Sequence, residues 1–459
     1  MTRLWIDVED LFDYAISNPR PSGIQRLAFE VYRALVGMPE MAGRVGFLRH
    51  APGGERFVVV DWAEVTRLFA GLSAPRRVVA KQEREVGEVR RALRRAVRRL
   101  PSDVSGPLRH AAGSQLQAVK QLGVLARVLL GRLRRREGSP AVVRVAAGVG
   151  FETVVRAGDV LASLGSPWFH PTYGALVGRA CAAHGLRFMI LVYDLIPLLR
   201  PEWCDRSLVR SFRDWHEAVL PLADRILAIS RATAADVERY AAEHGIVLRD
   251  RVRAIPIGTG FGGAVEEGAV EEGALRALPA AGSYVLIVST IEVRKNHLLL
   301  VKVWRRLLAE MPAGEVPTLV FAGRVGWMVA DLMQQLENTG YLGGAVALVA
   351  DPSDAELAAL YRGCLFTLFP SFYEGWGLPV SESLAFGKPC IISDATSLPE
   401  VGGTLARYID PEDVAGATRV IRATLEDRAG LAAWEARIGR EFRPVAWRET
   451  AQAVVEAMA

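Results

Sequence analysis

Short apolar runs alternate with helix-like patterns through the second half of the chain. The runs cover residues 284–290, 318–322, 345–350, 365–369 and 390–392. Between them, apolar residues recur every three or four positions, as in 355–361 and 378–386. Strands of four to seven apolar residues that alternate with helices are typical of a parallel sheet covered on both faces. This half therefore predicts a doubly wound α/β domain.

The first half has the same alternation, with one interruption. Strands are expected at 4–8, 56–60, 160–164, 188–193, 226–229 and 252–255, and helices at 24–35, 175–183, 207–220 and 232–242. Residues 261–282 are rich in Gly, Ala and Glu and read as a linker. We expect two Rossmann-like domains, 1–275 and 276–440, and a final helix within 441–459 that packs back on the first domain. Ligands of such sheets bind beyond the carboxyl ends of the strands, so two facing domains predict a cleft.

Composition narrows the class of protein. Of 459 residues, 51% are apolar and 23% are charged, which excludes overall disorder. Apolar stretches such as 188–192 fall well short of the ~20 residues that span a bilayer, and the first twenty residues show no secretory signal. The four cysteines stand far apart without a Cys-x-x-Cys pair, which indicates neither a zinc ribbon nor a disulfide framework. A cytoplasmic location is expected.

The positive charge is concentrated in the interruption of the first domain. Residues 75–137 hold 17 Lys and Arg against five Asp and Glu, so the rest of the chain is net negative. Arginines fill one face of a helical pattern over 86–100, and a second apolar stripe follows over 122–133. This basic helical insertion, about 72–148, predicts contact with an anionic membrane surface; a solvated hairpin packed on the protein is the alternative. Nucleic acid is disfavoured because the block has no aromatic residue to stack on bases.

The densest chemical signal is the segment 370–382, which follows an apolar strand and opens a helix. Its glycines allow close approach of backbone to a ligand, and Pro379 suits the first turn of a helix. Free amides at that helix start favour an anion. Glu374 in the loop and Glu382 in the helix could both face one pocket.

Three weaker signals lie elsewhere in the chain. Arg294 and Lys295 stand together before a helix, where an anionic ligand such as a diphosphate would offset their unfavourable position. Asp194 follows a first-domain strand, where a helix cap is as good an explanation as a functional role. Gly23 precedes the first helix, but a Gly-x-Gly-x-x-Gly fingerprint is missing.

Several common sites are not present in the sequence. There is no Asp-x-Asp pair, no Gly-x4-Gly-Lys-Ser/Thr loop and no His-Glu-x-x-His. We therefore expect neither a metal ion nor another cofactor.

Taken together, these segments resemble the retaining GT-B glycosyltransferases of family 4, in the branch of mannosyl- and related hexosyltransferases that build bacterial surface polysaccharides. In the second half the resemblance runs from about 284 to 413. It rests on residues 291–296, 321–324, 369–371, 374–382, 387–389 and 398–401, and in the first half on 22–24, 193–197 and 255–258. Residues 70–150 have no recognised counterpart.

The resemblance implies a role for each candidate residue. Glu374 would lie near the reacting face of the donor hexose, and Asp194 would be a second catalytic residue, although Tyr193 stands where many relatives have histidine. Glu382 would hold the ribose hydroxyls. The remaining donor-binding residues would be Arg294, Lys295, Gly375, Trp376, Gly377, Leu378 and Gly23.

The implied activity is metal-independent, retaining transfer of a hexose from a nucleotide diphosphate sugar, with mannose from GDP-mannose as the best guess. The acceptor would be a polyprenyl-linked or growing glycan, at the inner face of the plasma membrane. Two alternatives stay open: a nucleotide-sugar epimerase of the same fold, and a non-catalytic scaffold.

Overall fold

The computed structural model describes residues 2–18, 20–73, 149–260 and 278–459. The expected basic insertion at about 72–148 lies almost entirely outside these residues, and so does most of the expected linker 261–282. The described part of the chain forms one unit built on two sheets.

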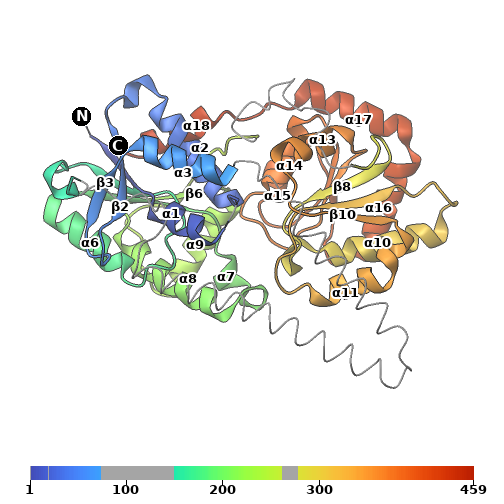
Figure 1. Ribbon diagram of the computed structural model, residues 1–459, viewed down its shortest axis with the longest axis horizontal. Helices are drawn as coiled ribbons and strands as arrows, with labels where there is room; N and C mark the ends of the chain where they lie inside the picture. Colours follow the sequence, from blue (N-terminus) through green and yellow to red (C-terminus); the bar gives the residue numbers. More distant parts are fainter. Residues whose placement is uncertain (1, 19, 74–148, 261–277) are drawn as a thin grey trace, which may run out of the picture. The chain divides into compact units, whose positions relative to one another are not determined.

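The first sheet has seven strands in the order β3-β2-β1-β4-β5-β6-β7 (Figure 1). Adjacent strands run parallel, except for the antiparallel pair β2 and β3. The strands are β1 (Leu4–Asp7), β2 (Val45–His50), β3 (Phe57–Val60), β4 (Val160–Ser163), β5 (Arg187–Val192), β6 (Arg225–Ala228) and β7 (Arg253–Ala254).

Helices cover both faces of this sheet because successive strand residues point to opposite sides. Leu4 and Ile6 of β1 pack in one hydrophobic cluster with α2 and α3, whereas Trp5 packs in another with α6 and α8. The helices are α1 (Glu9–Ser17), α2 (Gly23–Val36), α3 (Trp62–Ser73), α6 (Tyr173–His184), α7 (Ile196–Leu199), α8 (Arg206–Val219) and α9 (Arg231–Glu243).

The second sheet has six parallel strands in the order β10-β9-β8-β11-β12-β13, which is the Rossmann order. The strands are β8 (Tyr284–Val288), β9 (Thr318–Ala322), β10 (Val346–Val349), β11 (Thr367–Phe369), β12 (Cys390–Ser393) and β13 (Arg407–Ile409). The helices around them are α10 (His297–Glu310), α11 (Ala330–Asn338), α12 (Gly340–Gly343), α13 (Asp354–Gly363), α14 (Leu378–Ala385), α15 (Leu398–Gly402), α16 (Val414–Glu426) and α17 (Arg428–Glu441). The strand order reverses between β8 and β11, and such a switch point is where these folds bind ligands.

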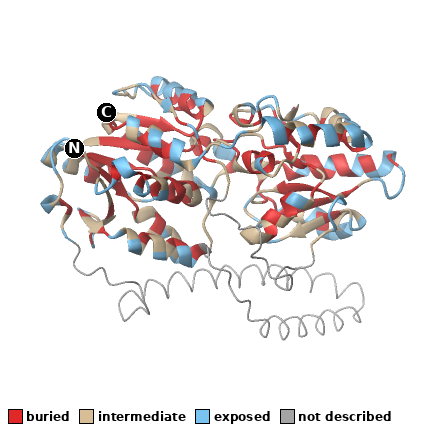
Figure 2. Ribbon diagram, turned by 90° about the horizontal axis from the view of Figure 1, so that it is seen from above, coloured by how far each residue is buried: buried red, intermediate tan, exposed pale blue. Residues whose placement is uncertain are grey.

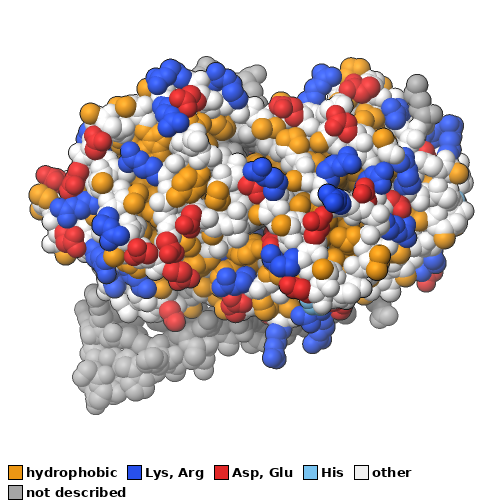
Figure 3. All heavy atoms as spheres, turned by 180° about the vertical axis from the view of Figure 1, so that it is seen from behind, with side chains coloured by type: hydrophobic (Ala, Val, Ile, Leu, Met, Phe, Trp, Pro, Cys, Tyr) orange, Lys and Arg blue, Asp and Glu red, His pale blue; other side chains and the backbone are white. Residues whose placement is uncertain are grey.

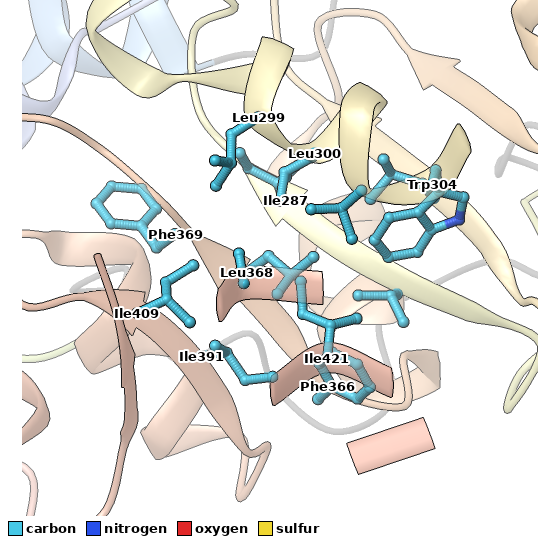
Figure 4. Packing of buried hydrophobic residues seen from close by; sticks show 14 of the residues in the cluster. Ile287, Leu299, Leu300, Trp304, Phe366, Leu368, Phe369, Ile391, Ile409 and Ile421 are labelled. Carbon is cyan, nitrogen blue, oxygen red and sulfur yellow. The ribbon is translucent and has the colours of Figure 1, made fainter. Parts of the chain in front are cut away.

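The larger core of this domain lies between the sheet and the helices that include α10 and α16 (Figure 4). Trp304 of α10 is fully buried, and its indole NH donates to the Pro317 carbonyl oxygen at 2.9 Å. Ile287, Leu368 and Ile391 contribute to the same core from three neighbouring strands. The central strands of both sheets are buried while the outer faces of the helices are exposed (Figure 2), as the alternation of apolar residues requires.

The last helix, α18 (Trp447–Glu456), packs with the first sheet rather than the second. Ala451 and Val454 belong to the cluster of β1 and α2, and Thr450 Oγ1 accepts a hydrogen bond from the Gly258 amide at 2.9 Å. A Cβ atom at Gly258 would lie 2.3 Å from the Trp447 ring, so only glycine fits there. The chain thus returns to its first domain after α17.

The predicted doubly wound architecture is confirmed, and the differences are local. Strand β2 is not predicted by the sequence pattern, because Gly46 interrupts its apolar run. That glycine is needed because a Cβ atom would lie 2.3 Å from the Trp5 ring on β1. Strand β13 is not predicted either, because its three residues are too few to show a period. In the ranges that the structure describes, no helix is both long enough and apolar enough to cross a bilayer.

Candidate donor-binding site

The loop between β11 and α14 carries the densest group of candidate residues. Gly377 ends it with a φ of +115°, which favours glycine, and α14 begins at Leu378 with Pro379 in its first turn. Helix α14 has no side-chain cap at its amino end. Because α14 follows β11 in the chain, its first amides lie at the carboxyl edge of the second sheet, where a helix start favours an anion.

Glu374 forms the centre of an ion cluster. Its Oε2 accepts from Arg294 Nη1 at 2.7 Å, and its Oε1 accepts from Lys295 Nζ at 2.6 Å. Arg294 Nη2 also donates to Glu292 Oε1 at 2.7 Å. The structure thus joins residues that lie 80 positions apart in the sequence, with Glu374 only 8% exposed at its side chain.

The electrostatics of the cluster favour an ionised Glu374. Burial opposes its charge, but Arg294 and Lys295 outweigh burial and lower its pKa to about 2. Burial and the neighbouring Arg294 charge lower the pKa of Lys295, an effect that Glu374 and Glu292 oppose. Burial likewise disfavours charged Arg294, but the surrounding carboxylates raise its pKa. Glu374 binds both cations and so holds them beside each other.

Asp194 lies next to this loop, from the first domain. Its Oδ1 accepts from the Ile196 amide at 3.0 Å, which forms a turn just before α7, whose N-cap is Leu195. A Cβ atom at Gly375 would lie 2.0 Å from the Tyr193 carbonyl oxygen and 3.1 Å from the Asp194 Cβ atom. Burial raises the pKa of Asp194, although the Arg294 charge acts in the opposite direction. Asp194 thus forms the turn before α7 and also lies beside the Glu374 loop.

Glu382 has a different set of partners from Glu374. It lies in α14, is 8% exposed, and its Oε2 accepts from the Tyr361 hydroxyl at 2.8 Å. Burial raises its pKa, while the Tyr361 hydrogen bond and the positive charge of Arg26 lower it. Glu374 precedes α14 and Glu382 lies within it. The two carboxylates therefore have separate hydrogen-bond partners.

The first domain contacts the start of α14 through the start of α2. Gly23 begins α2, and a Cβ atom there would lie 3.7 Å from Leu378 Cδ1. Leu378 and Trp376 pack against the hydrophobic cluster of β1 and α2. Arg26 Nη2 reaches Asp354 Oδ1 of the second domain at 2.9 Å.

Sequence reasoning missed several residues that build this site. Glu292 is 2% exposed, and its Oε2 has no hydrogen-bond partner among the described residues. The sequence pattern predicts Tyr361 only as part of a helix. Thr396 and Ser397 bind the backbone of Glu374, with Ser397 Oγ donating to its carbonyl oxygen at 2.9 Å. Only the proximity of Glu292 to Arg294 in the sequence could have signalled any of these roles.

The described surface has no obvious metal centre. Within the described residues, no group of three His, Cys, Asp or Glu side chains could hold a metal ion. Charged side chains of both signs are interspersed on the face shown in Figure 3.

The crystal structure of Anabaena Alr3699/HepE in complex with UDP and glucose superposes with a TM-score of 0.55 at 14% identity, over 100% of this chain and 99% of that one. The chain has a GT-B fold. Residues 276–440 match the family described as Glycosyl transferases group 1, which confirms the glycosyltransferase relationship predicted for the second domain.

Sequence relatives point the same way. The serotype-specific mannosyltransferase WbdA of Escherichia coli is 30% identical over 257 residues, or 54% of this chain and 31% of WbdA. The O-antigen chain mannosyltransferase B of Escherichia coli is 35% identical over 144 residues, or 31% of this chain and 37% of that protein. The chain thus spans about a third of the length of these relatives.

Proposed function

We propose that this GT-B chain transfers a hexose from a nucleotide diphosphate sugar to a glycan acceptor in surface-polysaccharide synthesis. The observation that carries the proposal is the Arg294–Glu374–Lys295 cluster beside the start of α14, in the domain that matches the glycosyltransferase family. Mannose is the favoured sugar because the relatives WbdA and O-antigen chain mannosyltransferase B are named mannosyltransferases. GDP-mannose is therefore the first donor to test.

The proposed chemistry uses charge rather than a metal ion. As the bond from the sugar to the diphosphate breaks, negative charge gathers on the leaving group, and preorganised cations and amides stabilise it. Arg294 and Lys295 would supply the cations. The backbone amides would be those of Gly377 and Leu378, at the start of α14. The retaining course follows if the acceptor hydroxyl attacks on the departing face and a phosphate oxygen takes its proton.

The ion pairs of the cluster must rearrange when a donor binds. Each cation has a carboxylate partner in the structure, at 2.6 or 2.7 Å. A bound diphosphate would therefore either share Lys295 and Arg294 with Glu374 or replace Glu374 as their partner. Glu374, displaced from Lys295, would then be free to accept hydrogen bonds from sugar hydroxyls.

Thermal stabilisation across a panel of nucleotide sugars tests the proposal, because a ligand that binds only the folded state raises the melting temperature. We expect one donor to give a clear shift that Lys295→Ala abolishes. No shift with any donor would contradict the proposal and favour a scaffold. Nucleotide release without an acceptor, with an epimerised sugar recovered, would instead identify an epimerase.

Contact with an anionic membrane stays a prediction, because residues 75–137 lie outside the described part of the chain. Deleting 76–136 should release the protein from vesicles that contain anionic lipid, since the basic block supplies the attraction. Unchanged sedimentation of the deletion variant with those vesicles would refute this part of the proposal.

A further inference from the structure

Glu400 of α15 caps a helix that belongs to the first domain. Its Oε2 accepts from the Arg231 amide at 2.9 Å, and its Oε1 accepts from the Ala232 amide at 2.8 Å. These are the first two amides of α9, which have no partner within their own helix. A carboxylate at a helix start is also favoured by the helix dipole. Glu400 therefore joins two segments 169 positions apart.

The turn before Glu400 holds the backbone of the Glu374 loop. Ser397 Oγ donates to the carbonyl oxygens of Glu374 and Trp376, each at 2.9 Å. Thr396 Oγ1 accepts from the Glu374 amide at 3.0 Å. The Glu400 amide donates to the Ser397 carbonyl oxygen at 2.9 Å, which ties the cap to this turn.

The same helix α9 contacts that loop directly. Thr233 Oγ1 lies 3.4 Å from the Gly375 carbonyl oxygen and 3.3 Å from the Tyr193 carbonyl oxygen. Thr233 is 1% exposed, so these polar contacts are shielded from water. The contacts form a closed circuit from α9 through Glu400 and Ser397 to the Glu374 loop, and back to α9 through Thr233.

We propose that Glu400 is a positioning residue, which couples α9 of the first domain to the orientation of Glu374. The inference rests on the proposed glycosyl transfer, because it assigns Glu374 to that reaction. Glu400 itself touches neither Arg294, Lys295 nor Glu382 in any contact of the described residues, so its loss acts on turnover more than on donor binding.

The first test is hydrogen exchange, which needs no substrate. In Glu400→Ala, the amides of Arg231 and Ala232 lose their acceptor, and we expect exchange to rise about tenfold both there and in the peptide 370–378. Arg231→Ala is the matched control, because it removes only the ion pair of an 81% exposed side chain and leaves the backbone cap. It should exchange like the wild type in both regions.

The second test measures turnover with GDP-mannose, and with the other nucleotide sugars of the panel. Glu400→Ala should lower kcat about tenfold, the effect of losing roughly one charge-assisted bond, while the donor-induced thermal shift stays. Glu400→Gln keeps one acceptor oxygen and should recover part of kcat. Asp427→Ala removes a helix cap at α17, where Asp427 Oδ1 accepts from Gly430, and should leave kcat unchanged.

The two proposals fail in different ways. A wild type that turns over no donor contradicts the proposed function, but the exchange experiment still decides the coupling. Unchanged exchange in 370–378 of Glu400→Ala, or a kcat equal to that of the wild type, would overturn the positioning role. A loss of the donor shift in Glu400→Ala would overturn it too, because the residue would then act on binding.

Discussion

Replacing Glu374 by glutamine removes the negative charge between Arg294 and Lys295 and keeps the shape of the side chain. Glutamine resembles the protonated glutamic acid, so the pKa of Glu374 predicts the cost. Two cations lower that pKa from an ordinary 4.5 to about 2. At 1.36 kcal/mol for each pKa unit, the charge contributes about 3 kcal/mol to the free energy of unfolding at neutral pH.

The sign of the pH dependence follows from the direction of the change. The pKa is lower in the folded state, so the stabilisation is complete above about pH 4.5 and disappears as the pH falls toward 2. We expect the difference between wild type and Glu374→Gln to be about 3 kcal/mol at pH 7 and about half of that at pH 3. Denaturant titrations at the two pH values measure it.

A matched control is Glu441→Gln, which alters an exposed ion pair with Arg437 on α17. Exposed pairs of this kind contribute little, about 0–1 kcal/mol. Lys295→Met should cost less than Glu374→Gln, because Arg294 still pairs with Glu374 and burial already disfavours the lysine charge. A cost for Glu374→Gln below about 1 kcal/mol at pH 7, or an equal cost at pH 3, would refute this account of the cluster.

Three further changes test the site and the core. Glu382→Ala should abolish the donor-induced thermal shift, whereas Tyr361→Phe should retain it and lower stability by about 1–2 kcal/mol through the lost hydrogen bond; equal shifts in both would contradict the role of Glu382. Gly375→Ala should lower kcat at least tenfold, because its Cβ atom would lie 2.0 Å from a backbone oxygen, while Gly439→Ala, with nothing within 4 Å, should leave kcat unchanged; similar kinetics would dispose of the steric argument. Burial lowers the pKa of His216 to about 4, so the free energy of unfolding should fall as the pH drops from 6.5 toward 4. In denaturant titrations, His216→Leu should flatten this pH dependence. An unaltered slope would exclude His216 as its source.

The sequence by itself determined the architecture. Apolar runs of strand length that alternate with a helical period leave few folds other than a parallel sheet with two covered faces. The same pattern located the loop of Glu374 at a strand end, and hence at the ligand edge of the sheet. The apolar pattern does not predict β2, because Gly46 interrupts it. Glycine is required there because the Trp5 ring on the neighbouring strand leaves no room for a side chain.

Only the tertiary structure decided which charges meet. Glu374 pairs with Arg294 and Lys295 from another strand end, while Glu382 pairs with the Tyr361 hydroxyl instead. Such partners are set by the order of strands in the sheet, and a sequence of periodic apolar residues does not encode that order. The cap that Glu400 places on α9 has the same origin, because its two acceptor oxygens meet amides 169 and 168 positions away, beyond the reach of any local pattern.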